Sequence, residues 1–402
     1  MQVVAINWHV YVLTHSALAL GFVGLTRVLP VIVFSMWGGL LADRADRRRV
    51  MFTAQAAMTV VSVVLAALAF TRRDSVALIY VLNAVQAAAT SFDNPARQAL
   101  VPRLVPTSDL AGALALNLAM FHTAMIVGPA LAGMLIAGGA TPHAGTPSAG
   151  AASDTASLGL IYALNAVSFA FVLLALATMH TSGRVVDGGA RESPGEALRS
   201  GLRFVFTTPL MVWTMTLDFF ATFFSGAMSL LPIVADQVLH VGAVGYGWLA
   251  AAPAAGALLG SLYTSVRPLP RRQGVTLLWS VAAYGVATIV YGLSRSYWLT
   301  ALALAGTGLA DVVSTVIRQT LRQLLTPDAL RGRMTAVNMI FFLGGPQLGE
   351  LEAGLVASLF ASAAVGVTVS IVSGGIVTLL VTAVVAGATP LVRRYSGELS
   401  RL

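Results

Sequence analysis

The chain has 402 residues, of which 57% are hydrophobic and only 10% are charged. Soluble domains carry charge on about a quarter of their residues, so this composition excludes an ordinary soluble globular protein and indicates that much of the chain faces lipid. The net charge of +8 lies in short clusters between apolar runs, which excludes a continuous nucleic-acid-binding face. The chain has no cysteine, so it cannot form a disulfide framework or a thiolate metal centre.

Eleven apolar stretches reach the length of about twenty residues that crosses the hydrocarbon core of a bilayer. Proline occurs inside several of them, and membrane helices tolerate it because neighbouring groups satisfy the freed backbone groups. We therefore predict an all-α membrane protein. The stretches cover residues 18–42, 49–70, 76–97, 112–138, 157–179, 209–232, 243–265, 275–294, 297–319, 334–360 and 365–389.

The chain begins with a twelfth apolar stretch, residues 1–14, which is too short for a full crossing. It carries two polar residues, Asn7 and His9. Histidine titrates near neutral pH, but a lone histidine is more often a packed polar residue than a proton-coupling site. We predict the packed role for His9.

The second span contains Arg27, the lone basic residue within an apolar stretch. A guanidinium in the membrane needs a partner, and either a carboxylate or an anionic substrate such as a catecholate would serve. We place Arg27 in the substrate cavity. A structural ion pair is the alternative.

The loop after the second span contains Gly39, Asp43, Arg44 and Arg47. Their order resembles a signature of the major facilitator superfamily, which has glycine where this chain has Asp46. A carboxylate here can face the positive N-terminus of the eleventh span in only one conformer, so we predict that the four residues gate the cytoplasmic side. A basic loop that only sets the membrane topology is the alternative.

The fourth span carries a polar stripe of Asn83, Gln86, Thr90, Asp93 and Arg97. Spacings of three and four residues place these side chains on one helical face. We predict that the first three line a substrate cavity and that Asp93 takes part in proton coupling. Hydrogen bonding between helices is the alternative for the amides.

The fifth span contains Gly128 and Pro129 at the start of the sequence Gly-Pro-Ala-Leu-Ala-Gly. This run resembles the Gly-Pro element of the exporter branch of the same superfamily, with alanine where that branch often has a further glycine. On this resemblance we assign both residues to gating and favour efflux over uptake.

A polar segment rich in glycine, serine and charge then separates six spans from six. If the loop at 38–50 is cytoplasmic, twenty of the 24 arginines lie on that side, and only Arg72, Arg73 and Arg295 lie on the other. The positive-inside rule therefore places the C-terminus in the cytoplasm. We predict an N-terminal bundle at 1–180, a cytoplasmic linker at 181–207, a C-terminal bundle at 208–390 and a cytoplasmic tail at 391–402.

Three acidic residues stand out in the second set of spans. Asp218 lies in the seventh span among phenylalanines, and Glu350 lies deep in the eleventh, so we predict that both take part in proton coupling. In the tenth span Asp311 and Arg318 lie two turns apart on one face, about 10 Å along the axis. We place Asp311 and Thr315 in the substrate cavity.

The second half of the sequence repeats the first at a constant offset of 221 residues over about a hundred positions. Gly39 aligns with Gly260 and Arg97 with Arg318. Two like-oriented bundles imply a parallel repeat with a substrate site near the membrane midplane. The offset also places the counterpart of Pro209, where the seventh span begins, before Met1. We therefore expect the first helix to be truncated, through a misassigned start or a real loss.

Further stretches at 94–100, 311–318 and 326–333 are similar to the transmembrane secretion effector, or enterobactin exporter-like, branch of the superfamily. The resemblance covers nearly the whole chain. It implies the major facilitator fold, with two six-helix bundles in a pseudo-twofold arrangement, and proton-driven export of an amphipathic compound such as a siderophore or a drug.

We therefore predict a monomeric, alternating-access antiporter in the bacterial inner membrane, with protons, a small-molecule substrate and the lipid bilayer as partners and no cofactor. The alternatives on the same fold are an uptake carrier and a lysophospholipid flippase. A membrane-embedded enzyme is disfavoured, because the sequence shows no metal-ligand cluster, no glycine-rich nucleotide loop and no nucleophile near a histidine.

Overall fold

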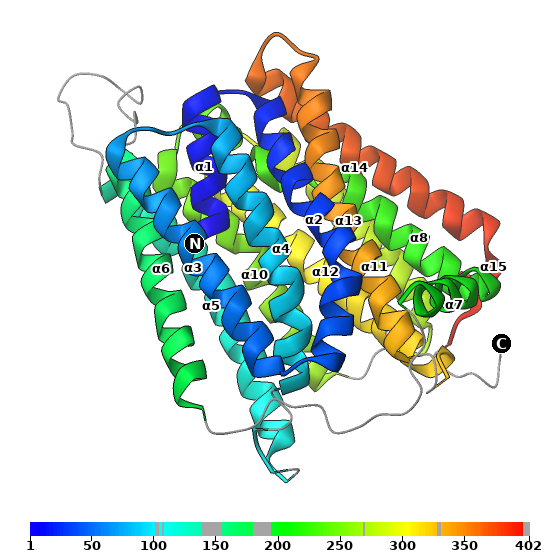
Figure 1. The fold of residues 1–402 in the computed structure, drawn as a ribbon. Helices are drawn as coiled ribbons and strands as arrows, with labels where there is room; N and C mark the ends of the chain where they lie inside the picture. The colour runs from blue at the N-terminus through cyan, green and yellow to red at the C-terminus, as the bar shows by residue number, and fades with distance from the viewer. Residues whose placement is uncertain are drawn as a thin grey trace. The chain divides into compact units, whose positions relative to one another are not determined.

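The computed structural model describes residues 1–100, 104–106, 108–138, 155–179, 194–267, 270–327 and 331–396. Every regular element in these ranges is a helix (Figure 1). This confirms the predicted all-α fold. The side chains of Asp43 and Arg44 lie outside the part of the chain that the structure describes.

The first half of the chain forms long helices that follow the predicted spans. Within this half, α3 packs against both α4 and α6. The helices are α1 (Gln2–Thr14), α2 (Ala17–Arg44), α3 (Arg47–Thr71), α4 (Val76–Leu100), α5 (Leu110–Gly138) and α6 (Thr155–Thr178).

The second half follows the same plan, and α11 packs against α12 and α14. Its elements are α7 (Pro194–Thr207), α8 (Pro209–Phe224), η2 (Ala227–Leu230), α9 (Leu231–Ile233), η3 (Val234–Val238), α10 (Gly242–Val266), α11 (Gln273–Leu293), α12 (Tyr297–Leu325), α13 (Arg331–Ser358), α14 (Ala363–Ala388) and α15 (Pro390–Arg394).

Two elements differ from the sequence expectation. Helix α7 lies inside the segment predicted as a linker, and its Val205 packs with Met211 and Met334 in a buried apolar cluster. The seventh span is interrupted after α8, where a 3-10 turn precedes Pro232. Proline has no backbone N–H to donate, and the N–H of Leu231 instead bonds the carbonyl of Met228, three residues back.

Ten helices in the described part of the chain are long and apolar enough to cross a membrane. Large apolar side chains lie on their outer surfaces, and Phe171, Trp279 and Leu302 are each at least 68% exposed. A soluble protein would bury such side chains, whereas a lipid environment favours them at the surface. Helix α13 is not among the ten, and it carries Gln347, Glu350 and Glu352.

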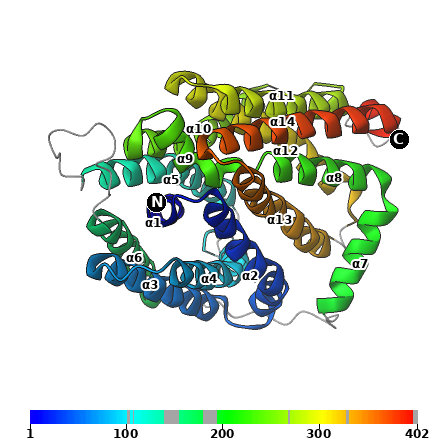
Figure 2. The same ribbon diagram turned by 90° about the horizontal axis from the view of Figure 1, so that it is seen from above.

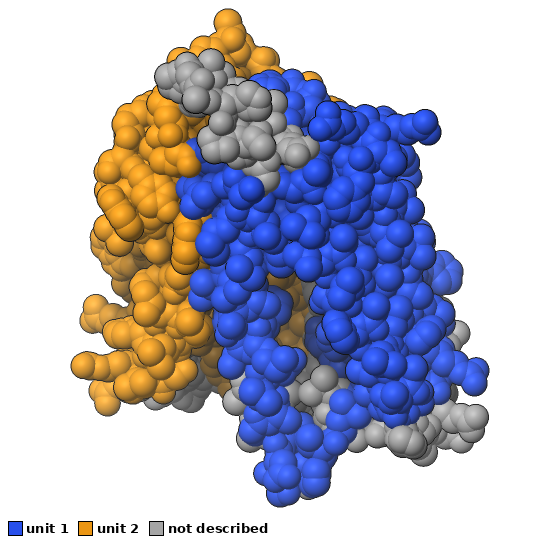
Figure 3. Space-filling view, turned by 90° about the vertical axis from the view of Figure 1, so that its left-hand side faces the viewer, with its two compact units in different colours: residues 1–15, 25–196, 242–247 blue, residues 16–24, 197–241, 248–402 orange. Residues whose placement is uncertain are grey.

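The chain divides into two compact units, coloured separately in Figure 3. The first unit comprises residues 1–15, 25–196 and 242–247, and the second comprises residues 16–24, 197–241 and 248–402. The division falls inside α2 and α10, so the first turns of α2 belong to the second unit and the first turns of α10 belong to the first. Figure 2 shows α3, α4 and α6 side by side in the first unit, and α11, α12 and α14 side by side in the second.

The internal repeat of the sequence recurs in the helix positions. Helices α4 and α12 begin at Val76 and Tyr297, and these two positions are separated by the offset of the sequence repeat. Helices α5 and α13 begin at Leu110 and Arg331, which are separated by the same offset. The matching packing of α3 and α11 on their neighbours extends the repeat from sequence to tertiary structure.

Candidate transport site

A buried ion cluster joins α8 and α12 inside the second unit. Arg318 of α12 forms an ion pair with Asp218 of α8. Its Nη2 also lies 3.6 Å from Oδ1 of Asp311 and donates a hydrogen bond of 2.9 Å to Oγ1 of Thr315. Arg318 is only 6% exposed, so a buried guanidinium stands between two carboxylates.

Local sequence explains how α12 contributes three of these groups. Asp311, Thr315 and Arg318 are spaced by four and three residues, which places them on one face of the helix. On α8, neighbouring phenylalanines pack along the helix around Asp218, and Phe219 also contacts Phe341 of α13 edge to face at 6.0 Å. This apolar packing holds α8 beside α13 while Asp218 points to α12.

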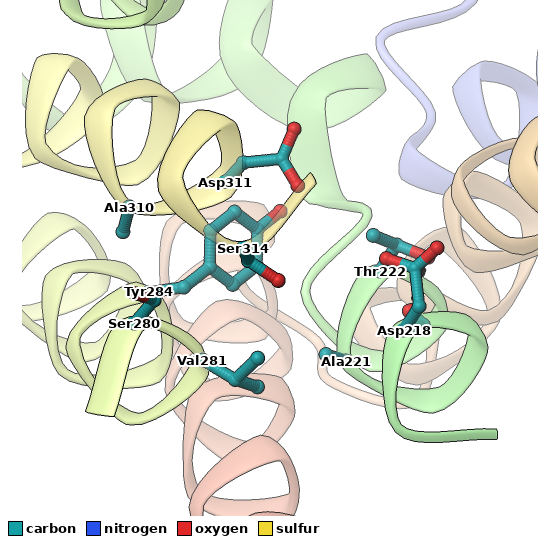
Figure 4. Close-up of a pocket in the computed structure, with 9 residues that line it drawn as sticks. All are labelled: Asp218, Ala221, Thr222, Ser280, Val281, Tyr284, Ala310, Asp311 and Ser314. Carbon is teal, nitrogen blue, oxygen red and sulfur yellow. Dashed lines mark hydrogen bonds between the residues drawn. The ribbon is translucent and has the colours of Figure 1, made fainter. Parts of the chain in front are cut away.

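A small pocket lies between α8, α11 and α12 (Figure 4). It encloses about 220 Å³ of empty space, part of which is open to solvent. Asp218 and Asp311 lie on opposite sides of it in Figure 4, and the hydroxyl of Tyr284 points toward the side of Asp311. The polar residues that line the pocket are Asp218, Thr222, Ser280, Tyr284, Asp311 and Ser314.

A second pocket, of about 300 Å³, borders the other side of the ion cluster. Its polar lining consists of Thr214, Asp218, Thr315, Arg318, Arg322 and Asn338. The ion cluster therefore separates an acidic, hydroxyl-lined pocket from one that carries two guanidinium groups. The structure brings together Asp218, Asp311 and Thr315, which the sequence placed in two different roles.

Tyr284 and Ser280 are lining residues that the sequence does not single out. They lie four residues apart on α11, so they share a helical face. That spacing is the signal in the sequence that could have identified them. Asn338 of α13 carries no such signal, because its neighbours at helical spacing are mostly apolar.

The predicted coupling residue Asp93 lies in the first unit and is 3% exposed. Its carboxylate accepts a hydrogen bond of 3.0 Å from Nε2 of Gln55 and pairs with Nη2 of Arg97 at 2.6 Å. Arg97 lies one turn away on the same helix, so Asp93 is neutralised within α4. Its role in proton coupling stays a prediction.

The predicted cavity residues of the polar stripe have different surroundings. Asn83 donates a hydrogen bond of 2.9 Å to Thr26 of α2, which is a contact between helices. Thr90 donates to the backbone carbonyl of Gln86, and the side-chain oxygen Oε1 of Gln86 is buried without a hydrogen-bond partner among the described residues. Arg27 is half-buried. Their place in a substrate cavity stays a prediction.

Glu350 is 8% exposed and packs against the first turns of α2 within the second unit. A Cβ added at Gly24 would lie 2.6 Å from Cβ of Glu350 and 2.8 Å from its Oε2. A glycine is therefore needed on α2 to admit this carboxylate. Proton coupling by Glu350 stays a prediction.

Residues of the loop that resembles the superfamily signature stabilise the start of α3 and its contact with α6. Asp46 caps α3, because its Oδ1 accepts a hydrogen bond of 3.0 Å from the N–H of Arg48. Arg48 donates to the carbonyls of Leu176 and Ala177 at the end of α6, at 2.6 and 2.7 Å. Arg47 is 8% exposed. Gating by Gly39, Asp43, Arg44 and Arg47 stays a prediction.

Gly128 and Pro129, the other predicted gating residues, lie beside a close helix crossing in the first unit. Gly133 of α5 and Gly247 of α10 meet there, and a Cβ on Gly247 would lie 2.6 Å from the carbonyl oxygen of Pro129. Small residues allow such close approach between membrane helices. In the second unit Gly354, the counterpart of Gly133 in the sequence repeat, meets α2 in the same way.

A repeated set of membrane-spanning helices with charged groups buried between them is the architecture of transporters of the major facilitator type. Solved structures of such transporters have the same fold. A bacterial homologue of the human lysosomal transporter Spinster superposes with a TM-score of 0.72 at 14% identity, covering 98% of this chain and 96% of that one. A bacterial homologue of the iron transporter ferroportin superposes with a TM-score of 0.65 at 16% identity, covering 96% and 95%.

The chain belongs to the transmembrane secretion effector family, which matches residues 1–393. The enterobactin exporters EntS of Shigella boydii serotype 18 and of Escherichia coli O81 are each 28% identical to it over 365 residues, which is 90% of this chain and 83% of each relative. The protein is therefore a multi-pass membrane transporter, as the sequence predicted, and not an enzyme.

Proposed function

We propose that the protein is a proton-coupled exporter of an amphipathic small molecule and that Asp218, Asp311 and Arg318 form its coupling centre. The observation that carries this proposal is the buried guanidinium between two carboxylates from different helices. One carboxylate neutralises Arg318, so the other can bind a proton without leaving the guanidinium unpaired.

The geometry favours Asp311 as the group that exchanges the proton. Its side chain is 41% exposed and borders the acidic pocket, whereas the side chain of Asp218 is 15% exposed. Deprotonated Asp311 competes with Asp218 for Arg318, and protonated Asp311 leaves Arg318 to Asp218. Proton binding by Asp311 therefore changes the strength of the Asp218–Arg318 ion pair between α8 and α12. This change can bias an alternating-access equilibrium.

The similarity to the enterobactin exporters supports a siderophore-like or drug-like substrate and outward transport. A substrate of this kind has apolar rings and several polar groups, and mixed apolar and hydroxyl surfaces suit it. We place the protein in the bacterial inner membrane as a monomer with a cytoplasmic C-terminus, moving substrate out as protons move in.

The proposal is tested in proteoliposomes with a substrate found by screening compounds in an efflux-deficient host. Asp311→Asn should slow transport driven by a proton gradient by about tenfold or more while substrate exchange without a gradient stays within about twofold of the wild type. Asp218→Asn should slow both gradient-driven transport and substrate exchange, because it removes the ion pair that joins α12 to α8.

Asp109→Asn is the matched control, because it makes the same chemical change at an exposed position between α4 and α5, and it should leave both rates unchanged. Wild-type gradient-driven transport by Asp311→Asn would remove Asp311 from the coupling mechanism. If Asp311→Asn slowed gradient-driven transport and substrate exchange equally, Asp311 would instead be a substrate-binding residue.

A further inference from the structure

A second buried polar cluster lies in the first unit, separate from the coupling centre. His9 of α1 is 0% exposed, and its Nε2 lies 3.3 Å from Oδ1 of Asp74 in the connection between α3 and α4. Its Nδ1 lies 3.2 Å from the hydroxyl of Tyr162, a fully buried residue of α6. His9 therefore has a carboxylate partner that its position in the sequence does not reveal.

The hydroxyl of Tyr162 can hydrogen-bond Nδ1 of His9 in either protonation state, while Nε2 lies 3.3 Å from Oδ1 of Asp74 without forming a hydrogen bond among the described residues. In the imidazolium form, Nε2–H faces the Asp74 carboxylate and Nδ1–H can donate to the hydroxyl of Tyr162. In the neutral form, Nε2–H still faces Asp74, and the hydroxyl of Tyr162 can donate to Nδ1. A buried nitrogen without a hydrogen bond is costly, and the attraction of the Asp74 carboxylate at 3.3 Å offsets that cost only when the imidazole carries the positive charge of the proton.

The surroundings leave Asp74 as the dominant charge. Within the described residues, Asp74 is the only charged group that interacts with His9, and α4 and α5, which also pack against α1, contribute none. Tyr246 of α10 lies close enough to Tyr162 to act on it electrostatically, and it stacks on Trp8, the neighbour of His9, at 5.3 Å. Gain or loss of one proton therefore changes the net charge of a site for which the described residues supply no other compensating ion.

We propose that His9, Asp74 and Tyr162 form a proton-binding site within the first unit. With the proton bound, an imidazolium–carboxylate pair ties α1 to the connection between α3 and α4, while Tyr162 adds α6 to the same contact. Release of the proton removes the charge from one partner and weakens the tie. The packing of α1 within its unit thus responds to pH through a site that does not share a residue with the coupling centre.

Histidine titration measured by solid-state NMR tests this site directly. The full-length protein is produced with ¹³C,¹⁵N-labelled histidine, reconstituted in lipid, and observed between about pH 5 and pH 9, the range across which histidine charge is tuned. The signal lost in His9→Asn belongs to His9. It should change from the doubly protonated to the neutral form within this range, and Asp74→Asn should move its midpoint by about one pH unit or more.

Two controls keep the outcome interpretable. Asp109→Asn, on an exposed connection, should move none of the six histidine signals. If His9→Asn does not fold, the His9 signal is identified as the one that remains when each of the other five histidines is replaced in turn. A His9 signal that keeps one form throughout the range, or one that titrates without responding to Asp74→Asn, would overturn the proposal.

Discussion

Gly24 occupies a position where the chain has no room for a side chain. A Cβ there would lie 2.6 Å from Cβ of Glu350 and 2.8 Å from its Oε2, and it would also meet the carbonyl oxygen of Gln347. Backbone atoms of a helix cannot move aside as the end of a flexible side chain can. The position of the Glu350 carboxylate therefore requires a residue without a Cβ at position 24 of α2.

Gly24→Ala should accordingly destabilise the protein by about 1 to 3 kcal/mol, the usual cost of overpacking a well-packed site. The measurement is the thermal unfolding midpoint of the purified protein in detergent. Gly387→Ala is the matched control, because nothing lies within 4 Å of the Cβ that it adds to α14. The control should be neutral or slightly stabilising, since alanine favours helix more than glycine does. Equal midpoints for the two variants would contradict the close approach of α2 and α13.

At this scale the sequence identifies which residues matter better than it identifies their partners. Asp218 and Asp311 stand out as acidic residues in apolar helices, so their importance can be read locally. Helical spacing also places Arg318 on the same face as Asp311, but the pairing of Arg318 with Asp218 cannot be read, because the two lie far apart along the chain and no helical periodicity relates them. Asp74 was missed for the same reason, since it follows Arg72 and Arg73 in a polar connection and only the fold brings it to His9.

At the scale of elements, the residue at the start of α3 differs from the superfamily signature: Asp46 stands where the signature has glycine, and it caps the helix. Asp46 occupies the N-cap and accepts a hydrogen bond from the N–H of Arg48. Glycine at this position leaves that N–H without a side-chain acceptor but remains a tolerated N-cap residue. The side chain therefore stabilises the start of the helix, and we expect it to make no contribution to transport.

Asp46→Ala should lower stability by about 0.5 to 2 kcal/mol, while Asp46→Gly should cost only a few tenths. Thermal unfolding gives the stability, and transport per unit of folded protein gives the function. Transport should be the same in both variants and the wild type. A variant with wild-type stability and altered transport would instead place Asp46 in the gating machinery.

The helix positions are largely predictable, because an apolar run of bilayer length has few alternatives to a helix. The two exceptions have local physical causes. Helix α7 is amphipathic: Leu202 and Val205 are spaced by three residues and pack in one apolar cluster, so the segment predicted from the sequence only as a linker forms a helix. The interruption after α8 falls at Ser225 and Gly226, where a Cβ on Gly226 would lie 2.8 Å from the carbonyl oxygen of Pro346, and an apolar sequence does not reveal that close approach to α13.

At the scale of the whole molecule, the repeat predicts that corresponding connections lie on the same side of the membrane. The chain has no cysteine, so single cysteines can be introduced without removing others. Arg73→Cys and Arg295→Cys, at exposed positions in corresponding connections, should react with an impermeant maleimide in intact cells. Arg199→Cys and Arg393→Cys should react only after permeabilisation.

Two labelling results would contradict this topology. Labelling of Arg73→Cys and Arg295→Cys from opposite sides would break the parallel relation between the halves. Labelling of Arg393→Cys in intact cells would place the C-terminus outside. The repeat itself is readable because its offset stays constant through loops, and the structure places the starts of two helix pairs at that same offset.

The sequence does not reveal that each unit includes residues from the other half of the chain. The opening turns of α2 complete the second unit, and those of α10 complete the first. A chimaera that joined the N-terminal half of this transporter to the C-terminal half of a relative would therefore inherit mismatched surfaces inside both units. We therefore expect recombination between such genes to preserve folding only where both parents keep the small residues at the two glycine crossings, Gly133 with Gly247 and Gly21 with Gly354.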